Sequence, residues 1–448
     1  MPRDLVVWRG AVPAGRGRAV EVLRGLVARI DAVTPAGRDR AVDALRGLAI
    51  GGVVVGHWLV TGLVVDSGAV HGASPLRYLP QLAPLSWVFQ TLAVFFLVGG
   101  RTGASGYASA RGRGVSYGRW LGGRLTRLSR PVAAVLVVWS VAAVAMLASG
   151  AGLETVRVLV KLVYSPLWFL LVFAVLTAVT PLAVRLRPLW PLAVVALVDL
   201  ARFGLGGPTW LGWINVVAGW LVPYCLGAAW ARNDLNERGD LNERGDLNGR
   251  GDLNGRGDLR GLPGRGALRG PHRLRGPRGR GAGWALLLGG AAATSALVLW
   301  AGYPAAMVGV PGAAVSNLNP PTLAAVTFGL AQCGAALLLA GPLRRMLRRP
   351  AVWAVVAMVN LSAMTIFLWH QTAMMAVTAL GLLADRPLPG LHTVPDGYGW
   401  LLARLAWLPA FMLALLVCWA AFHAHERGRP GGAERERRPA RELGVRRA

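Results

Sequence analysis

The chain has 448 residues, of which 54% are hydrophobic and only 15% are charged, and its mean hydropathy is +0.47. Soluble globular chains rarely combine these values, so the composition excludes an ordinary water-soluble domain and indicates a polytopic membrane protein. The formal net charge of +27 does not indicate nucleic-acid binding, because the arginines fall in blocks between apolar segments, as the positive-inside rule expects of cytosolic loops. We therefore expect the lipid bilayer, and no nucleic acid, as a partner.

The three cysteines, Cys225, Cys333 and Cys418, all lie in apolar segments and lack the spacing of metal ligands. We expect them to be small membrane-embedded side chains. The sequence therefore predicts no disulfide framework, no metal site and no bound cofactor.

Both ends of the chain are basic. Residues 1–37 lack the apolar core and the small-residue cleavage site of a signal peptide, so we expect a cytosolic extension, with a short amphipathic helix around 20–33. Residues 427–448 are expected to form a basic cytosolic tail that anchors the topology.

Residues 38–426 contain ten apolar segments long enough to cross about 30 Å of hydrocarbon. They lie near 41–65, 84–100, 131–149, 166–184, 188–203, 210–231, 283–301, 321–342, 351–383 and 400–422. Arginine blocks follow the second, fourth, sixth and eighth segments, which places both termini in the cytosol. The predicted fold class is all-α, a polytopic membrane protein with about ten transmembrane helices.

A six-residue repeat follows the sixth apolar segment. Its units begin at Asp234, Asp240, Asp246 and Asp252, and it fades at Asp258. One leucine per unit is too little apolar surface to offset the entropy of ordering, so we expect 232–282 to be a disordered cytosolic loop. A calcium-binding repeat is the alternative, but the nonapeptide period and the Gly-Gly pairs that it needs are missing.

The first apolar segment carries two ionisable residues at helical spacing, since His57 follows Arg46 by eleven residues. Eleven helical residues make three turns, about 16 Å, and return to within roughly 20° of the starting direction, so the two side chains share a face. Ionisable groups inside a membrane span are costly and mark functional paths. The alternative is that Arg46 snorkels to the interface while His57 packs against another span.

Five short motifs occur in order along residues 38–425. They are Asp43-x-x-Arg46-Gly47 with His57, Phe95-Phe96-Leu97-Val98-Gly99-Gly100, Arg124-x-x-Arg127 followed by Arg130-Pro131, Leu167-Trp168-Phe169-Leu170, and Leu368-Trp369-His370. Together they resemble the membrane-bound acyltransferase 3 family, in an actinobacterial branch. The second motif is similar to a turn in that family, and Gly99 stands where many members have serine, which excludes a seryl nucleophile there.

The resemblance implies an enzyme that moves an acyl group, other than an aminoacyl group, from coenzyme A to an extracytoplasmic hydroxyl. Acyl-coenzyme A is the expected co-substrate, and the acceptor is expected to be a carbohydrate, a cell-envelope component or a secondary metabolite. The predicted acyltransferase 3-like transmembrane domain covers 38–426, with 232–282 inserted in it. A multi-pass protein of the cell membrane is predicted.

Transfer to a hydroxyl needs a base for the proton and positive charge near the donor or the developing oxyanion. His57 and His370 are the expected catalytic histidines, because helical rise places them about 24 and 28 Å from the cytosolic ends of their spans. Arg46 is the third expected catalytic residue and would hold the donor. Asp43, one turn earlier, would fix its guanidinium.

Five further contacts are expected at the two ends of the path. Arg124, Arg127 and Arg130 are candidates for binding donor phosphates, or they mark a cytosolic loop. Trp168 is a candidate platform for the acceptor, and Asp199 a candidate partner that orients a histidine, although interfacial tryptophans are common in membrane proteins. A transporter or flippase is the alternative function, and it should show related halves with interrupted helices.

Overall fold

The structure is a computed structural model of the chain. It describes residues 21–250 and 277–426 except 22–23, 26, 36, 67, 314 and 385, with side chains described up to 234 and from 280 to 423. The described part is helical apart from one short hairpin, β1 (Gly62–Asp66) paired with β2 (Ala69–Ala73). The all-α fold class is therefore confirmed.

Twelve longer helices make up most of the described chain. They are α2 (Arg40–Val60), α5 (Leu92–Gly112), α6 (Tyr117–Ala148), α7 (Leu153–Tyr164), α8 (Leu167–Ala178), α10 (Leu189–Asp199), α11 (Ile214–Arg250), α12 (Pro277–Trp300), α13 (Leu323–Met346), α14 (Pro350–Leu361), α15 (Ala363–Gly381) and α16 (Tyr398–Glu426). Shorter pieces are α3 (Pro75–Tyr78), α4 (Ala83–Ser86), α9 (Thr180–Ala183), a π turn (Leu200–Gly204) and 3₁₀ turns (Pro80–Leu82, Thr209–Trp213). The described residues between 21 and 32 are also helical, which confirms the N-terminal helix.

Among the residues that the structure describes, eight candidate spans are long and apolar enough to cross a membrane. They are Arg40–Val60, Tyr117–Ala148, Leu153–Ala178, Thr209–Asp234, Arg280–Trp300, Leu323–Met346, Ala363–Gly381 and Tyr398–His423. The second and fifth predicted spans correspond to α5 and α10, which are not among the eight. The second half of α5 is rich in glycine, serine and alanine, and α10 has only 11 residues. A multi-pass membrane protein follows, and the count of ten remains a prediction.

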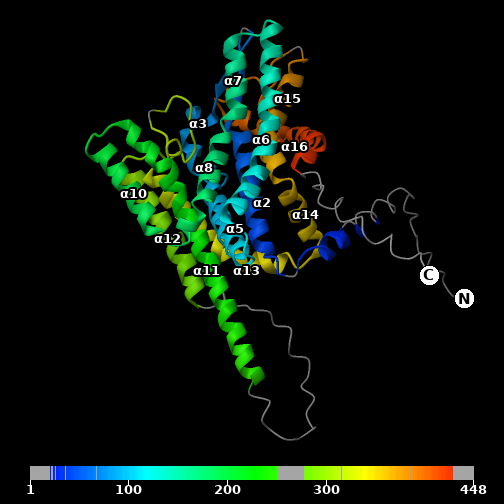
Figure 1. Cartoon of the computed structure of the whole chain (residues 1–448). Coiled ribbons are helices and arrows are strands. Elements are labelled where there is room, and N and C mark those ends of the chain that lie inside the picture. Colours follow the sequence, from blue (N-terminus) through cyan, green and yellow to red (C-terminus); the bar gives the residue numbers. More distant parts are fainter. Residues whose placement is uncertain are drawn as a thin grey trace, which may run out of the picture.

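Helix α2 lies inside the bundle and contacts α5, α13, α14 and α15 (Figure 1). It begins after Asp39, whose carboxylate accepts a hydrogen bond from the amide of Ala41, and it ends at Thr61, where the backbone becomes extended. Gly52 and Gly56 leave no room for a Cβ, because Thr91 and Phe89 pack directly against them. The helix is thus held along its length by neighbours on several sides.

The expected turn at Phe95–Phe96 through Gly99–Gly100 is wrong, because the motif lies inside α5. A Cβ on Gly100 would overlap the carbonyl oxygen of Tyr224 on α11, and a Cβ on Gly227 would overlap the carbonyl oxygen of Leu97 on α5. Small residues let membrane helices approach to backbone contact. The glycines therefore serve a helix crossing.

The predicted disordered loop over 232–282 also needs correction at both ends. Helix α11 continues to Arg250, beyond the neighbouring helices (Figure 1), and α12 already begins at Pro277. Extending an existing helix avoids the cost of nucleation. An ion pair between Asp234 and Arg101 also holds α11 against α5 at the start of the repeat. The rest of the repeat loop, 251–276, and the basic tail, 427–448, lie outside the described residues.

Candidate functional site

The side chains of the two expected catalytic histidines are neighbours in the structure. The imidazole of His57 on α2 and that of His370 on α15 have ring centroids 5.2 Å apart, with an angle of 45° between the ring planes. His370 is fully buried (0% exposed), whereas His57 is partly buried. Arg46 and His57 both lie in the unbroken helix α2, so the regular helical geometry keeps them on one face.

Hydrogen bonding defines the tautomer of His370. Its Nδ1 bonds to the carbonyl oxygen of Phe367, and a carbonyl can only accept, so Nδ1 carries the proton. The Nε2 atom is then an acceptor, and it is buried without a hydrogen-bond partner in the described part of the chain. A buried polar atom of this kind calls for an explanation.

Arg46 lies in the second turn of α2, on the helix face that carries His57. Its Nη2 is 3.5 Å from the hydroxyl of Thr102 on α5. Its Nη1 is 4.0 Å from Asp43, but Asp43 binds Arg38 more closely, at 2.6 Å. Asp43 is therefore shared between two arginines and lies closer to Arg38, so it does not fix the Arg46 guanidinium by itself.

A second arginine converges on Thr102 from another helix. Arg124 on α6 donates to the carbonyl oxygen of Thr102 at 3.1 Å, and its guanidinium stands 5.1 Å from the ring centroid of Trp120. The structure thus brings together Arg46 and Arg124, two of the residues expected to bind the donor, at one residue of α5.

Arg124 and Arg127 also line a hollow of about 310 Å³ between α5 and α6. Its lining is Gly106, Ser109, Ala110, Arg113, Val115, Arg119, Trp120, Gly123, Arg124 and Arg127. We call this the basic hollow. Four arginines around a small volume suit a ligand with several negative charges. Arg130 is exposed and does not line it.

Sequence reasoning missed Arg113 and Arg119, because an arginine block beside a span is also what topology requires. The spacing of arginines cannot show which of them face a common hollow. Only the packing of α5 against α6 selects four of them.

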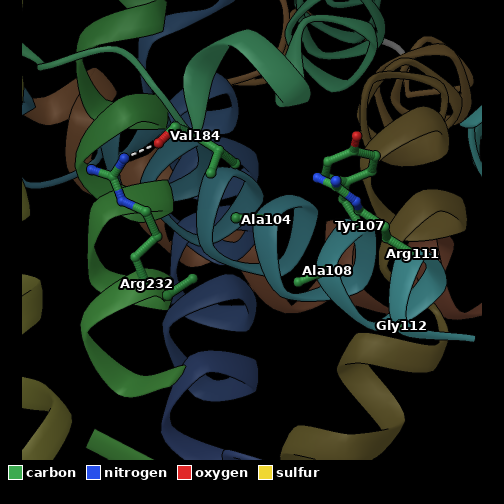
Figure 2. Close-up of a pocket in the computed structure, with 8 residues that line it drawn as sticks. Ala104, Tyr107, Ala108, Arg111, Gly112, Val184 and Arg232 are labelled. Atoms are coloured by element: carbon green, nitrogen blue, oxygen red, sulfur yellow. Dashed lines mark hydrogen bonds between the residues drawn. The ribbon is translucent and has the colours of Figure 1, made fainter. Parts of the chain in front are cut away.

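A larger hollow of about 540 Å³ lies on the opposite face of α5, between α5, α9 and α11. Figure 2 shows Arg232 and Arg111 at its two ends, with Ala104 and Ala108 between them, and Arg232 donates to the carbonyl oxygen of Val184. Its walls are mainly alanine, glycine and valine. With two arginines instead of four, it suits a multiply charged ligand less well than the basic hollow.

Trp168 belongs to an aromatic cluster that reaches the histidine pair. Its ring lies 6.4 Å from Phe169 and 6.5 Å from Trp220. Phe169 packs 5.3 Å from Phe367, which packs 5.9 Å from His370. Trp168 is thus two aromatic neighbours away from His370 and makes no ring contact with it.

Asp199 lies elsewhere. Its carboxylate accepts hydrogen bonds from the backbone amide of Leu323 at 2.7 Å, the Tyr303 hydroxyl at 3.0 Å and the Asn215 amide at 3.0 Å. The structure does not bring it to either histidine. Its donors instead show a carboxylate that holds the N-terminal end of α13, where free backbone amides favour an anion.

Four charged residues that sequence reasoning missed tie together the start of α2, the middle parts of α5 and α11, and the last turn of α13. Arg101 pairs with Asp39 at 2.7 Å and with Asp234 at 2.5 Å, and Arg344 pairs with Asp39 at 2.7 Å. Burial alone would raise the pKa of Asp39, but the hydrogen bond from Arg344 and the charges of Arg101 and Arg344 outweigh it and hold that pKa below 3.8.

A family model described as an acyltransferase domain matches residues 39–423. The match runs from the residue that caps α2 to the last turns of α16, and it contains every candidate residue discussed above. No curated protein and no solved structure matches the chain. No group of three potential metal ligands occurs among the described residues.

Proposed function

Because the chain belongs to the acyltransferase 3 family, we propose that this multi-pass membrane acyltransferase takes its acyl group from cytosolic acyl-coenzyme A. The acceptor is a hydroxyl of a carbohydrate, a cell-envelope component or a secondary metabolite at the cell membrane, and the group is not an aminoacyl group. The observation that carries the proposal is the His57–His370 pair, at 5.2 Å, on the face of α2 that leads back to Arg46.

The donor would bind at the cytosolic end by its phosphates. The basic hollow offers four guanidinium groups, whose planar fork binds phosphate through two parallel hydrogen bonds. The indole of Trp120 adds an aromatic face to the same wall. Arg46, which meets Arg124 at Thr102, would hold the donor where it leaves the basic hollow and enters the bundle.

The histidine pair would handle the proton. His57 is the more accessible ring, so it is placed to take the proton from the acceptor hydroxyl. Nε2 of His370 can accept a hydrogen bond from a His57 N–H, which would turn the other His57 nitrogen, with its lone pair, toward the hydroxyl. Hydrogen bonds of this kind are often long before substrates bind.

The bond changes balance in a direct transfer. The acceptor oxygen forms an ester bond with the acyl carbonyl carbon, the carbon–sulfur bond of the thioester breaks, and His57 returns the hydroxyl proton to the departing thiolate. The neutral imidazole of His57 takes the proton in the first step, and the imidazolium it becomes returns that proton in the second.

The proposal is tested with the full chain in nanodiscs, supplied with acyl-labelled acyl-coenzyme A and a hydroxyl-bearing envelope extract. We expect free coenzyme A thiol and labelled ester to appear in equal amounts, and both to depend on His57. A transporter or flippase would move an acceptor without releasing thiol, so substrate movement without thiol release would contradict the proposal.

A further inference from the structure

A buried arginine stands beside the histidine pair. Arg404 on α16 is 1% exposed, and it forms no ion pair with any described carboxylate. A buried charge without a counter-ion is expensive and persists only when other groups satisfy it. Arg404 is satisfied by three backbone carbonyl oxygens: Trp58 at 2.6 Å, Thr61 at 2.7 Å and Gly390 at 2.7 Å.

Two of these carbonyls belong to the end of α2. Trp58 lies in its last turn, and Thr61 is the residue that ends it. The last carbonyls of a helix have no partner within the helix, and a cation there interacts favourably with the helix dipole. In a membrane, where water cannot supply these hydrogen bonds, Arg404 caps α2 from another helix.

The capped turn carries the histidine. Trp58 directly follows His57, and its indole N–H donates to the backbone oxygen of His370 at 2.9 Å. Arg404 also contacts the sulfur of Met374, one turn after His370 on α15, at 2.8 Å. One side chain therefore touches both the end of α2, which carries His57, and the turn of α15 that follows His370.

The third carbonyl ties the site to the segment before α16. Gly390 has φ +78°, and a Cβ on it would come within 2.8 Å of the backbone nitrogen of Arg404. Only glycine fits such a backbone conformation and such a close approach. The Arg404 guanidinium is thus held by the end of α2 on one side and by the segment before α16 on the other.

From these contacts we propose that Arg404 is a positioning residue that holds His57 at its distance and angle from His370. The inference rests on the proposed function, in which the two histidines act together. Lysine cannot replace the planar fork that reaches three carbonyls, so the two cations should not be equivalent at this place.

The test compares Arg404→Gln and Arg404→Lys with Arg157→Gln, full-length and in nanodiscs. Arg157 is a matched control because it is exposed and, among the described residues, its ion pair is with the exposed Glu154. For each protein, histidine modification by diethylpyrocarbonate is mapped by mass spectrometry, and kcat and KM for acyl-coenzyme A are measured.

In Arg404→Gln we expect His370 to lose its protection and kcat to fall by about 10²-fold, the effect typical of a displacement near 1 Å, while KM stays unchanged. Arg404→Lys should recover part of both. Wild-type protection of His370 and wild-type kcat in Arg404→Gln would overturn the proposal, and so would a fall in kcat with unchanged protection. The modification of His370 can be measured without any acyl transfer. A failure of this inference can therefore be told apart from a failure of the proposed function, which is tested by the transfer rate of His57→Ala.

Discussion

Gly100 on α5 leaves free the space that the carbonyl oxygen of Tyr224 on α11 occupies. The hydroxyl of Tyr224 in turn bonds Thr180 at 2.7 Å, so the crossing also fixes the start of α9. Thr102, which both Arg46 and Arg124 contact, lies two residues beyond Gly100 on α5. The helix crossing thus sets the position of Thr102 and of the two arginines that contact it.

Gly100→Ala should therefore destabilise the fold by about 1–3 kcal/mol, because the added methyl group forces two packed backbones apart. Gly289 on α12 is a matched control, since a Cβ there meets nothing within 4 Å. Gly289→Ala should be neutral or stabilising, by at most about 1 kcal/mol. Thermal unfolding in detergent checks both variants, and equal Tm values for the two would show that the crossing tolerates a side chain.

Arg46 should act on donor binding. Arg46→Ala should weaken acyl-coenzyme A affinity by about 10–100-fold, the loss expected for a charge-assisted hydrogen bond of 1.5–3 kcal/mol. Arg46→Lys should recover only part of it, because a point charge lacks the planar fork. Arg348→Gln, at an exposed position, serves as the control and should bind normally. An unchanged affinity for acyl-coenzyme A in Arg46→Ala would contradict a donor-binding role. It would instead support the alternative that Arg46 only extends its charge to the membrane interface.

The basic hollow makes a separate prediction about phosphate. If Arg119 and Arg127 hold phosphate groups of the donor, Arg119→Gln with Arg127→Gln should weaken acyl-coenzyme A binding and reduce its dependence on salt, since fewer charge pairs remain to be screened. Titrations at two ionic strengths measure both effects. An unaltered salt dependence would place the phosphates outside the basic hollow.

Asp39 should stabilise the fold at neutral pH through Arg101 and Arg344. Asp39→Asn should cost about 1.5–3 kcal/mol, the range for hydrogen bonds to charged groups. The pKa of Asp39 is lowered from 3.8, so the contribution is complete above pH 3.8 and is lost only as the pH falls through the lower folded value. The Tm difference from wild type should therefore be the same at pH 8 and pH 5.

Glu154→Gln is the control for Asp39, since it breaks an exposed ion pair whose side chains are 71% and 64% exposed. Such pairs contribute little, so its Tm should stay near that of the wild type. A Tm difference for Asp39→Asn that disappears between pH 8 and pH 5 would contradict the lowered pKa.

The spacing of residues in the sequence correctly predicted features that depend on the geometry of a single helix. The spacing of Arg46 and His57 placed both on one helix face because α2 is a regular helix of 21 residues. The depth assigned to His370 by helical rise stays a prediction, because it assumed one span over 351–383, which the structure divides into α14 and α15. That α2 and α15 are neighbours could not be read from spacing, because this contact depends on how distant segments pack.

Sequence patterns gave wrong predictions, or none, for features that depend on contacts between distant segments. The Gly99–Gly100 pair looks like a turn but serves a helix crossing. The start of the repeat looks disordered, yet α11 runs on through it to Arg250. Arg404 sits in an apolar segment with no local partner, and only the contact of α16 with the end of α2 gives it a role.

The central claim is that His57 takes the acceptor proton, and the most direct test is the transfer rate of His57→Ala at saturating acyl-coenzyme A, with donor affinity measured on the same nanodisc sample. The account predicts normal donor affinity and a rate lower by roughly 10²–10⁴-fold, the effect typical of removing a general base. A transfer rate within a few-fold of wild type would contradict it.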